Sequence, residues 1–176
     1  MKTRFDWRGM ILFAIALAIV ALDQYTKALV RENLPLNTSW MPIPWLDPFV
    51  TLTHTRNTGA AFGLFPSLGV VFRLISLVVV VAITFLFRRL AAGSWLLRIA
   101  FGLQLGGATG NLIDRVAWGY VTDFIDVRVW PIFNVADSAL VVGTALLAYY
   151  ALFVEPSAAR RGESSPQESC ADGGRG

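Results

Sequence analysis

The chain has 176 residues, of which 55% are hydrophobic and only 15% are charged, and its mean hydropathy is +0.57. This composition is too apolar for an ordinary soluble domain of this length and predicts a membrane protein. The net charge of +3 does not indicate a nucleic-acid partner, because the basic residues stand in short clusters beside apolar runs, and a single Cys and a single His exclude a disulfide framework and a Cys/His metal site.

The first apolar run begins at Met10 and continues to about Val30, after a short basic segment. No small-residue cleavage site follows it, so the pattern favours a retained membrane span over a signal peptide. The run contains Asp23 and Lys27, which are spaced i,i+4 with the acid before the base, the favourable order on a helix. Counted back from Val30, Asp23 is expected about 10 Å inside the span.

Residues 31–67 change to Pro, Asn, Thr and Trp and predict a small domain outside the membrane. Phe49 to His54 alternates apolar and polar residues, as a half-exposed strand does. The same segment is rich in large apolar side chains, which suit either the headgroup level of a membrane or a minor core under a loop. These side chains are Trp40, Met41, Ile43, Trp45, Leu46 and Phe49.

Two more spans are predicted at Leu68–Phe87 and at about Trp95–Ile113, joined by a short basic turn. The third span repeats glycine every four residues, a pattern that favours close helix packing. Packing does not explain the polar side chains at its end. The glycines are Gly102, Gly106 and Gly110, and a neighbouring row with the same spacing holds Gly107, Asn111 and Arg115 beside Asp114.

The stretch from Val121 to Ser138 carries three acids, and the last of them, Asp137, is the only charge in the apolar run from Pro131 to Val154. That run is long enough to cross a bilayer core of about 30 Å as a helix. A carboxylate inside a span costs roughly 2.5–3.5 kcal/mol, which indicates a functional site or a structural carboxylate held by helix-terminal donors. Asp137 is expected about 9 Å below Pro131, where a loop carrying Asp123 could fold back over it.

The basic clusters predict the topology, because positive residues gather on the cytoplasmic side. We expect both termini in the cytoplasm and one four-span domain over residues 1–155, with extracytoplasmic loops at about 31–67 and 114–130. Residues 156–176 are polar and rich in Ser, Gly and Pro, which predicts a disordered cytoplasmic tail. The basic residues concerned are Lys2, Arg4, Arg8, Arg88, Arg89, Arg98, Arg160, Arg161 and Arg175.

Two carboxylates that approach each other share one proton, because burial and like charge raise one pKa. One member then acts as base on a water molecule while the other donates a proton to a carbonyl, as in aspartic proteases. Asn134, one helical turn before Asp137, is placed to orient a carboxyl group. The alternatives are a bound cation or a proton path in a small four-span transporter subunit. A serine or cysteine protease is disfavoured, because His54 is the only histidine.

The sequence resembles a known family, bacterial lipoprotein signal peptidase, also called signal peptidase II. The resemblance covers all four predicted spans in order, without a departure inside the motifs. They are DQYTK at Asp23–Lys27, NTGAAFG at Asn57–Gly63, GGATGNLIDR at Gly106–Arg115, VTDF at Val121–Phe124 and FNVADS at Phe133–Ser138.

The resemblance implies an all-α membrane fold of four transmembrane helices, with a small extracytoplasmic β-sheet cradle and an interfacial helix. It also implies an aspartic endopeptidase of the bacterial inner membrane, which cuts a diacylated prolipoprotein before its lipidated cysteine. Asp123 and Asp137 would be the catalytic pair, and Asp114 and Asp126 would serve in structural pairing. The positions matching substrate- or inhibitor-binding residues are Asp23, Lys27, Asn57, Gly107, Asn111, Arg115 and Asn134.

The resemblance implies no metal and no cofactor, and no nucleic-acid partner. The expected partners are the diacylated prolipoprotein, membrane lipid and a cyclic peptide inhibitor of the globomycin type. A site near the outer leaflet of the inner membrane is also expected on physical grounds. A diacylated substrate cannot leave the bilayer without exposing its acyl chains, at roughly 0.8 kcal/mol per CH₂, so the peptide bond must be met at the interface.

Overall fold

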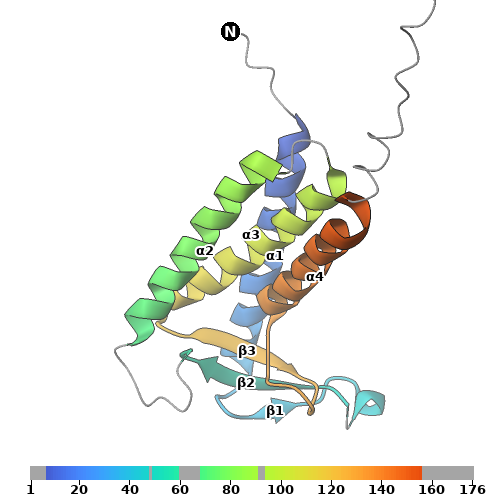
Figure 1. Ribbon diagram of the computed structural model, residues 1–176. Helices are drawn as coiled ribbons and strands as arrows, with labels where there is room; N and C mark the ends of the chain where they lie inside the picture. The colour runs from blue at the N-terminus through green and yellow to red at the C-terminus, as the bar shows by residue number, and fades with distance from the viewer. Residues whose placement is uncertain (1–6, 48, 60–67, 91–93, 156–176) are drawn as a thin grey trace, which may run out of the picture.

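Four long helices run side by side, and a small sheet covers one end of them (Figure 1). The computed structural model describes residues 7–47, 49–59, 68–90 and 94–155. The motif NTGAAFG is therefore described only to Gly59, and the C-terminal tail lies outside the described residues. The helices are α1 (Trp7–Asn33), α2 (Leu68–Leu90), α3 (Trp95–Ala117) and α4 (Val135–Tyr149), which the π-helical segment η3 (Tyr150–Val154) extends.

Among the described residues, three helices are long and apolar enough to cross a membrane, over Met10–Asn33, Val70–Phe87 and Val135–Val154. α2 exposes large apolar side chains such as Val78 along its length, a surface suited to lipid rather than water. The chain is therefore a multi-pass membrane protein. α3 does not reach the same apolarity, and it packs against each of the other three helices. A helix surrounded by protein needs little lipid-facing surface, so it can carry polar residues.

The glycines of α3 let the neighbouring backbones approach. A Cβ atom on Gly106 would lie 2.9 Å from the carbonyl oxygen of Ala16 in α1, and one on Gly102 would lie 3.1 Å from the carbonyl oxygen of Leu12. On the α4 side, a Cβ atom on Gly107 would lie 2.5 Å from the carbonyl oxygen of Ala136. The close packing predicted from the glycine spacing is confirmed.

The sheet has three antiparallel strands in the order β1 (Ser39–Trp40), β2 (Thr51–Asn57) and β3 (Val121–Asp126). Thr55 pairs with Asp123, and the register shifts between Leu52 and Thr55. The strand predicted at 49–54 is displaced toward the C-terminus, and the loop expected to carry Asp123 is in fact β3. That expectation was wrong because β3 forms only by pairing with β2, far away in the sequence.

α4 begins at Val135 and not at Pro131, which corrects the position of Asp137. Before the helix, Phe133 pairs with Ile125 of β3 through backbone hydrogen bonds of 2.7 and 3.1 Å. Asn134 is the N-cap and Asp137 stands in the first helical turn. Asp137 therefore lies in the first turn of the span and not about 9 Å inside it.

The aromatic segment between β1 and β2 forms only a short 3₁₀ turn, η1 (Pro44–Leu46), where a longer interfacial helix was implied. Several of its large side chains are exposed, among them Ile43 at 40%, Trp45 at 77% and Phe49 at 69%. Of the two interpretations of this segment, the small core under a loop is wrong. The exposed aromatic edge remains.

The glycine contacts predict the cost of a single methyl group. Gly106→Ala would place its Cβ 2.7 Å from the Cβ of Ile19 and against a backbone oxygen, so α1 and α3 must move apart. We expect the variant to lose about 1–3 kcal/mol of stability, measured as a lower melting temperature in detergent. Val142→Ala, on the exposed side of α4, is the matched control, and equal melting of both variants would contradict the packing.

Candidate active site

One asparagine side chain links the two aspartates proposed as a pair. Asp123 lies in the middle of β3 with 2% of its surface exposed, and Asp137 is half-buried in the first turn of α4. The Nδ2 of Asn134 donates to Oδ1 of Asp123 over 2.6 Å, and its Oδ1 accepts from the backbone N–H of Asp137 over 2.9 Å. The strand and the helix are therefore linked through one asparagine side chain.

The start of α4 explains why Asp137 stands there. Asn134 caps the helix through the backbone N–H of Asp137, and Oδ2 of Asp137 accepts from the backbone N–H of Asn134 over 3.2 Å. This reciprocal pair is a capping box, which satisfies backbone donors that a helix start leaves free. One carboxylate oxygen of Asp137 is thereby held by the backbone.

Two further asparagines, both singled out in the sequence, complete the hydrogen bonds of the pair. Asn57, at the end of β2, donates to Oδ2 of Asp123 over 3.0 Å, and Asn111 of α3 donates to Oδ1 of Asp137 over 2.8 Å. All four carboxylate oxygens thus accept an N–H. Asn57 is exposed whereas Asn111 is buried, so the side of the pair next to Asn57 is the open one.

Burial raises the pKa of the Asp123 carboxyl to about 6. The charge of Asp137 also raises this pKa, while the hydrogen bonds from Asn57 and Asn134 and the charge of Lys27 lower it. Desolvation is the largest of these effects. Below about pH 6, Asp123 therefore keeps a proton that an exposed aspartate would release.

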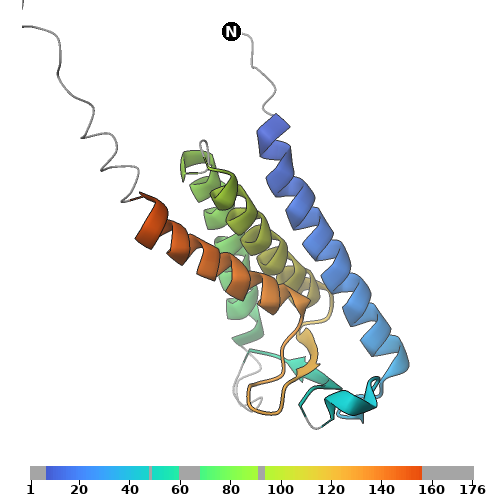
Figure 2. The ribbon, with the colours of Figure 1, turned by 90° about the vertical axis from the view of Figure 1, so that its right-hand side faces the viewer.

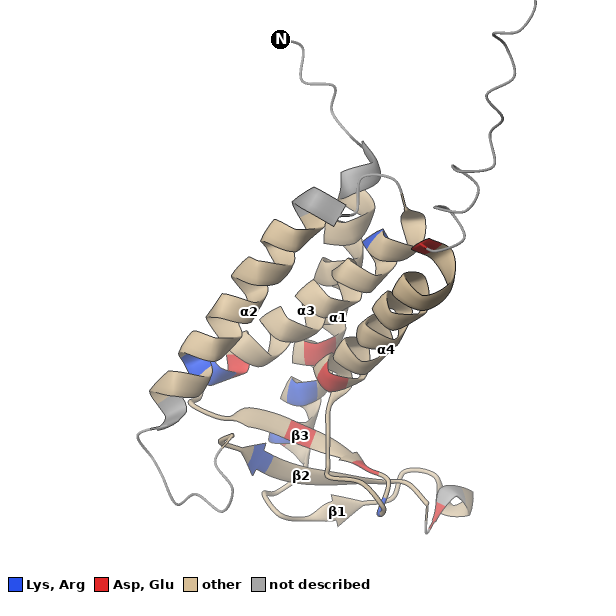
Figure 3. Ribbon diagram, in the orientation of Figure 1, with Lys and Arg blue, Asp and Glu red and all other residues tan. Residues whose placement is uncertain are grey.

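Asp23 and Lys27 lie behind the pair and are fully buried. Figure 3 shows these charges gathered where the helices meet the sheet. The Nζ of Lys27 is 2.8 Å from Oδ2 of Asp23, 3.3 Å from Oδ2 of Asp114 and 3.0 Å from Oδ1 of Asn111. The structural pairing expected of Asp114 is present, and Arg31 joins it at 3.6 Å.

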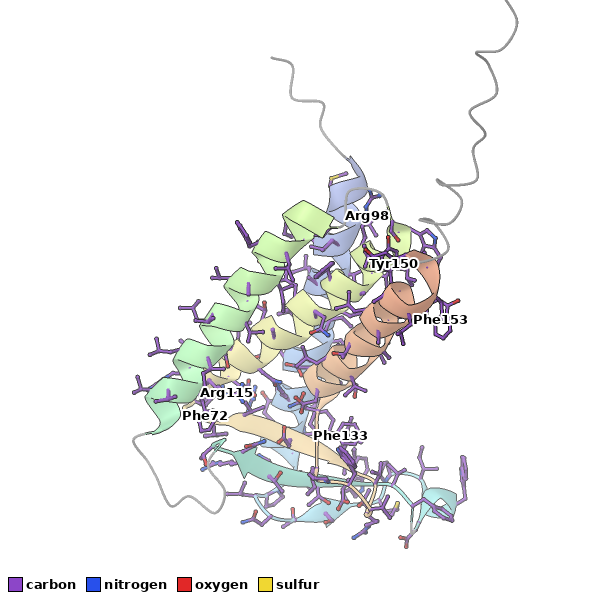
Figure 4. The ribbon with its side chains drawn as sticks, viewed as in Figure 1. Phe72, Arg98, Arg115, Phe133, Tyr150 and Phe153 are labelled. Carbon is purple, nitrogen blue, oxygen red and sulfur yellow. The ribbon has the colours of Figure 1, made fainter. Side chains whose placement is uncertain are left out.

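Arg115 and Gly107 stand on two other sides of the site. Arg115 donates to Oγ of Ser76 in α2 over 3.2 Å, and its charge acts on both aspartates of the pair. Figure 4 shows Arg115 beside the part of α2 that carries Phe72. Gly107 lies against the backbone of α4, so its observed role is packing.

Three residues near the site were missed in the sequence. Gln24 donates to Oδ2 of Asp23 and to Oδ1 of Asp114, Arg31 donates to Oγ1 of Thr122, and Thr122 donates its backbone N–H to Asp114. Gln24 lies inside the motif DQYTK and Thr122 inside VTDF, which was the available signal. Arg31 follows Lys27 by one helical turn, a spacing that could have indicated a shared partner.

Several known proteins are similar to this chain. A family model described as signal peptidase (SPase) II matches residues 15–153. The lipoprotein signal peptidase of Bacillus subtilis (strain 168) is 45% identical over 142 residues, covering 78% of this chain and 90% of that protein. That of Halothermothrix orenii is 41% identical over 138 residues, covering 78% and 92%.

Two solved structures of bacterial membrane enzymes, determined by the in meso method, are also similar. The one at 1.9 Å resolution has a TM-score of 0.75 and 34% identity, covering 81% of this chain and 92% of its own. The one at 2.3 Å has a TM-score of 0.70 and 32% identity, covering 92% and 94%. The likeness therefore extends over most of both chains.

The pKa of Asp123 predicts a pH-dependent stability. Its folded value of about 6 exceeds the ordinary 3.8, so the native state gains from the bound proton at low pH and loses that gain as pH rises through 6. The ionised carboxyl then costs about 3 kcal/mol. Asp123→Asn removes this cost. The asparagine cannot accept both amide hydrogen bonds, and this loss destabilises the folded state by about 1 kcal/mol.

We therefore expect Asp123→Asn to melt at a higher temperature than the unmodified protein at pH 7.5. The gap should close at pH 4, where the native carboxyl is protonated. Thermal unfolding in detergent at both pH values checks this. A variant that melts below the unmodified protein at pH 7.5 would contradict the raised pKa.

Proposed function

This chain belongs to the signal peptidase II family, and on that premise we propose that Asp123 and Asp137 are the catalytic pair with which it removes the signal peptides of lipoproteins. It is a membrane peptidase. The observation that carries the assignment is the shared amide of Asn134, which contacts Asp123 with its nitrogen and caps the turn of Asp137 with its oxygen. Acid–base hydrolysis needs two carboxyl groups held at one point.

The proposed mechanism begins with one proton on the pair. The ionised carboxylate takes a proton from a water molecule as the water oxygen attacks the scissile carbonyl carbon, and the protonated carboxyl donates to the carbonyl oxygen. The resulting diol collapses when a proton passes to the amide nitrogen and the C–N bond breaks. The raised pKa of Asp123 favours this residue as the holder of the proton. Asn57, Asn111 and Asn134 keep the carboxyl oxygens in place.

The alternative of a small proton- or cation-coupled transporter subunit has no support. Asp23, Lys27, Asp114, Asp123 and Asp137 are in one network at one end of the helices (Figure 3). A path across a membrane needs charged groups at successive depths. A cluster at one interface suits chemistry on a bound substrate.

For the topology, we propose four membrane spans, with α3 as the central one. The first turns of α1, the end of α2, the start of α3 and the end of η3 lie away from the sheet (Figures 1 and 2). Basic residues gather at these same segments, which supports a cytoplasmic position for them and for both termini. The sheet then forms a cradle on the outer face of the inner membrane, and residues 156–176 form a cytoplasmic tail.

For the substrate, we propose a prolipoprotein with a diacylglyceryl group on the cysteine after the cut. Asp137 stands in the first turn of α4, and this position supports a pair at the level where a lipid-anchored peptide bond would enter water. The acyl chains would remain among membrane lipids beside the helices. A cyclic peptide inhibitor of the globomycin type would occupy the same open side, next to Asn57.

The pair can be tested by removing either exchangeable proton. Asp123→Asn or Asp137→Asn should each lower kcat by about 10²–10⁴-fold, the scale of a lost general acid or base. The double variant should be little slower than either single variant, because the two groups act as a unit. Cleavage of a diacylated prolipoprotein by purified protein in detergent measures this.

Asp126→Asn is the matched control, on the same strand as Asp123. Asp126 accepts from Oγ1 of Thr53 and from the backbone N–H of Arg128, away from the pair. The Asp126→Asn variant should retain kcat within about threefold, since substitutions away from special features of a fold usually change its stability little. The assignment fails if Asp137→Asn cleaves normally while Asp126→Asn does not.

The lipid requirement can be tested with two forms of one precursor. The diacylated form should have a kcat/KM at least about 100-fold above that of the unlipidated form, because the acyl chains supply binding energy at the membrane edge. Mass spectrometry of the released signal peptides would measure both. Equal cleavage would contradict the proposed substrate.

A further inference from the structure

Lys27 uses all three of its N–H donors inside the protein. Its fully buried ammonium contacts Asp23 at 2.8 Å on its own helix, and Asp114 at 3.3 Å and Asn111 at 3.0 Å on α3. An ammonium group has three donors and no acceptor. Each of the three partners has a second contact, and each of those contacts leads toward the aspartate pair.

The first connection runs through Asp23 to α4. The Oδ1 of Asp23 accepts from the backbone N–H of Ala136 over 3.0 Å, while its Oδ2 faces Lys27. Ala136 directly precedes Asp137. The position of the first turn of α4 relative to α1 is thus set by a carboxylate that Lys27 holds.

The second connection has the same form on the strand. The Oδ2 of Asp114 accepts from the backbone N–H of Thr122 over 2.9 Å and also faces Lys27. Thr122 directly precedes Asp123. One ammonium group therefore holds two carboxylates, and each carboxylate holds the residue just before one member of the pair.

The third connection sets the direction of an amide. Because an ammonium group can only donate, the oxygen of Asn111 must face Lys27. Its Nδ2 then points to Asp137 and donates to Oδ1 over 2.8 Å. An inverted amide would present its oxygen to the carboxylate. The Oδ1 of Asn111 also accepts from Nδ2 of Asn134 over 3.2 Å, so Lys27 and Asn134 together give Asp137 a donor.

We propose that Lys27 is a positioning residue of the reaction, which sets the separation and orientation of Asp123 and Asp137 through Asp23, Asp114 and Asn111. The inference rests on the proposed function of the pair. Lys27 touches no substrate, since its surface is fully buried. Its effect is therefore expected on the chemical step and not on substrate binding.

A purely stabilising role would be a weak reason for this arrangement. Two charges taken out of water cost several kcal/mol each, and a buried ion pair is often no better for stability than apolar residues of the same volume. Apolar residues could not accept the backbone N–H groups of Ala136 and Thr122, or orient Asn111. The cluster thus serves geometry that an apolar core cannot supply.

Lys27→Met tests the inference, because methionine has a similar length and no charge. A displacement of about 1 Å at a reacting group lowers rates about 10²-fold, so kcat on a diacylated prolipoprotein should fall by about that factor while KM stays within about threefold. The variant leaves two buried carboxylates, Asp23 and Asp114, with Arg31 beside Asp114 and no cation in place of Lys27, so its stability should fall as well.

A charge-balanced variant separates the two effects. Lys27→Met with Asp23→Asn leaves one buried carboxylate, Asp114, opposite one cation, Arg31. Its melting temperature should recover toward that of the unmodified protein, whereas kcat should remain about 10²-fold low, because Asp114 and Asn111 have lost their contacts with Lys27. Arg128→Met is the control. It removes a cation beside Asp126, away from the pair, and its kcat should stay within about threefold.

Recovery of kcat together with the melting temperature in the balanced variant would show that Lys27 acts only through stability, and would overturn the inference. So would failure of the balanced variant to fold, since Lys27 would then be required for the fold itself. A large rise in KM with unchanged kcat would also overturn it. In each case, inactive Asp123→Asn and Asp137→Asn variants would leave the proposed catalytic pair intact.

Discussion

The hydrogen bonds of Asn134 are the interaction on which the site depends. A helix start leaves backbone donors free, and one amide oxygen satisfies the donor of Asp137. The amide nitrogen on the same side chain then has a fixed direction, toward Asp123. A requirement of helix formation in this way brings a strand residue and a helix residue together. The local sequence FNVAD is therefore both a helix cap and part of the proposed active site.

The polar residues around the pair are buried in a membrane protein, and their contacts offset the free-energy cost of burying charge. Buried charges are unfavourable unless they are paired and hydrogen-bonded, and around Lys27 each carboxylate has both a cation and backbone or amide donors. α3 can supply Asn111 and Asp114 because the other helices cover it. Its glycines allow that cover to be close. The apolar surface of α2 faces outward and needs no such compensation.

The sequence predicted which residues lie near the site better than it predicted how they are arranged. The motifs placed Asn57, Asn111 and Asn134 near the aspartates, and all three donate to the pair. Asp23 and Lys27 were expected to hold substrate or inhibitor, and the structure buries them behind the pair. Residue types and order do not reveal which face of a helix turns inward. For α1 that depends on where α3 and α4 pack.

The sequence was sufficient to predict a multi-pass membrane protein with isolated acids in its apolar runs, because apolar length and isolated charge are local properties of a chain. It also carried the family motifs. The position of Asp123 on a strand came from the fold, since β3 needs β2 as a partner. The start of α4 at Val135 also came from the fold, since Phe133 is held by Ile125. The contacts of Asn134 with Asp123 and Asp137 depend on both of these pairings, which no local pattern encodes.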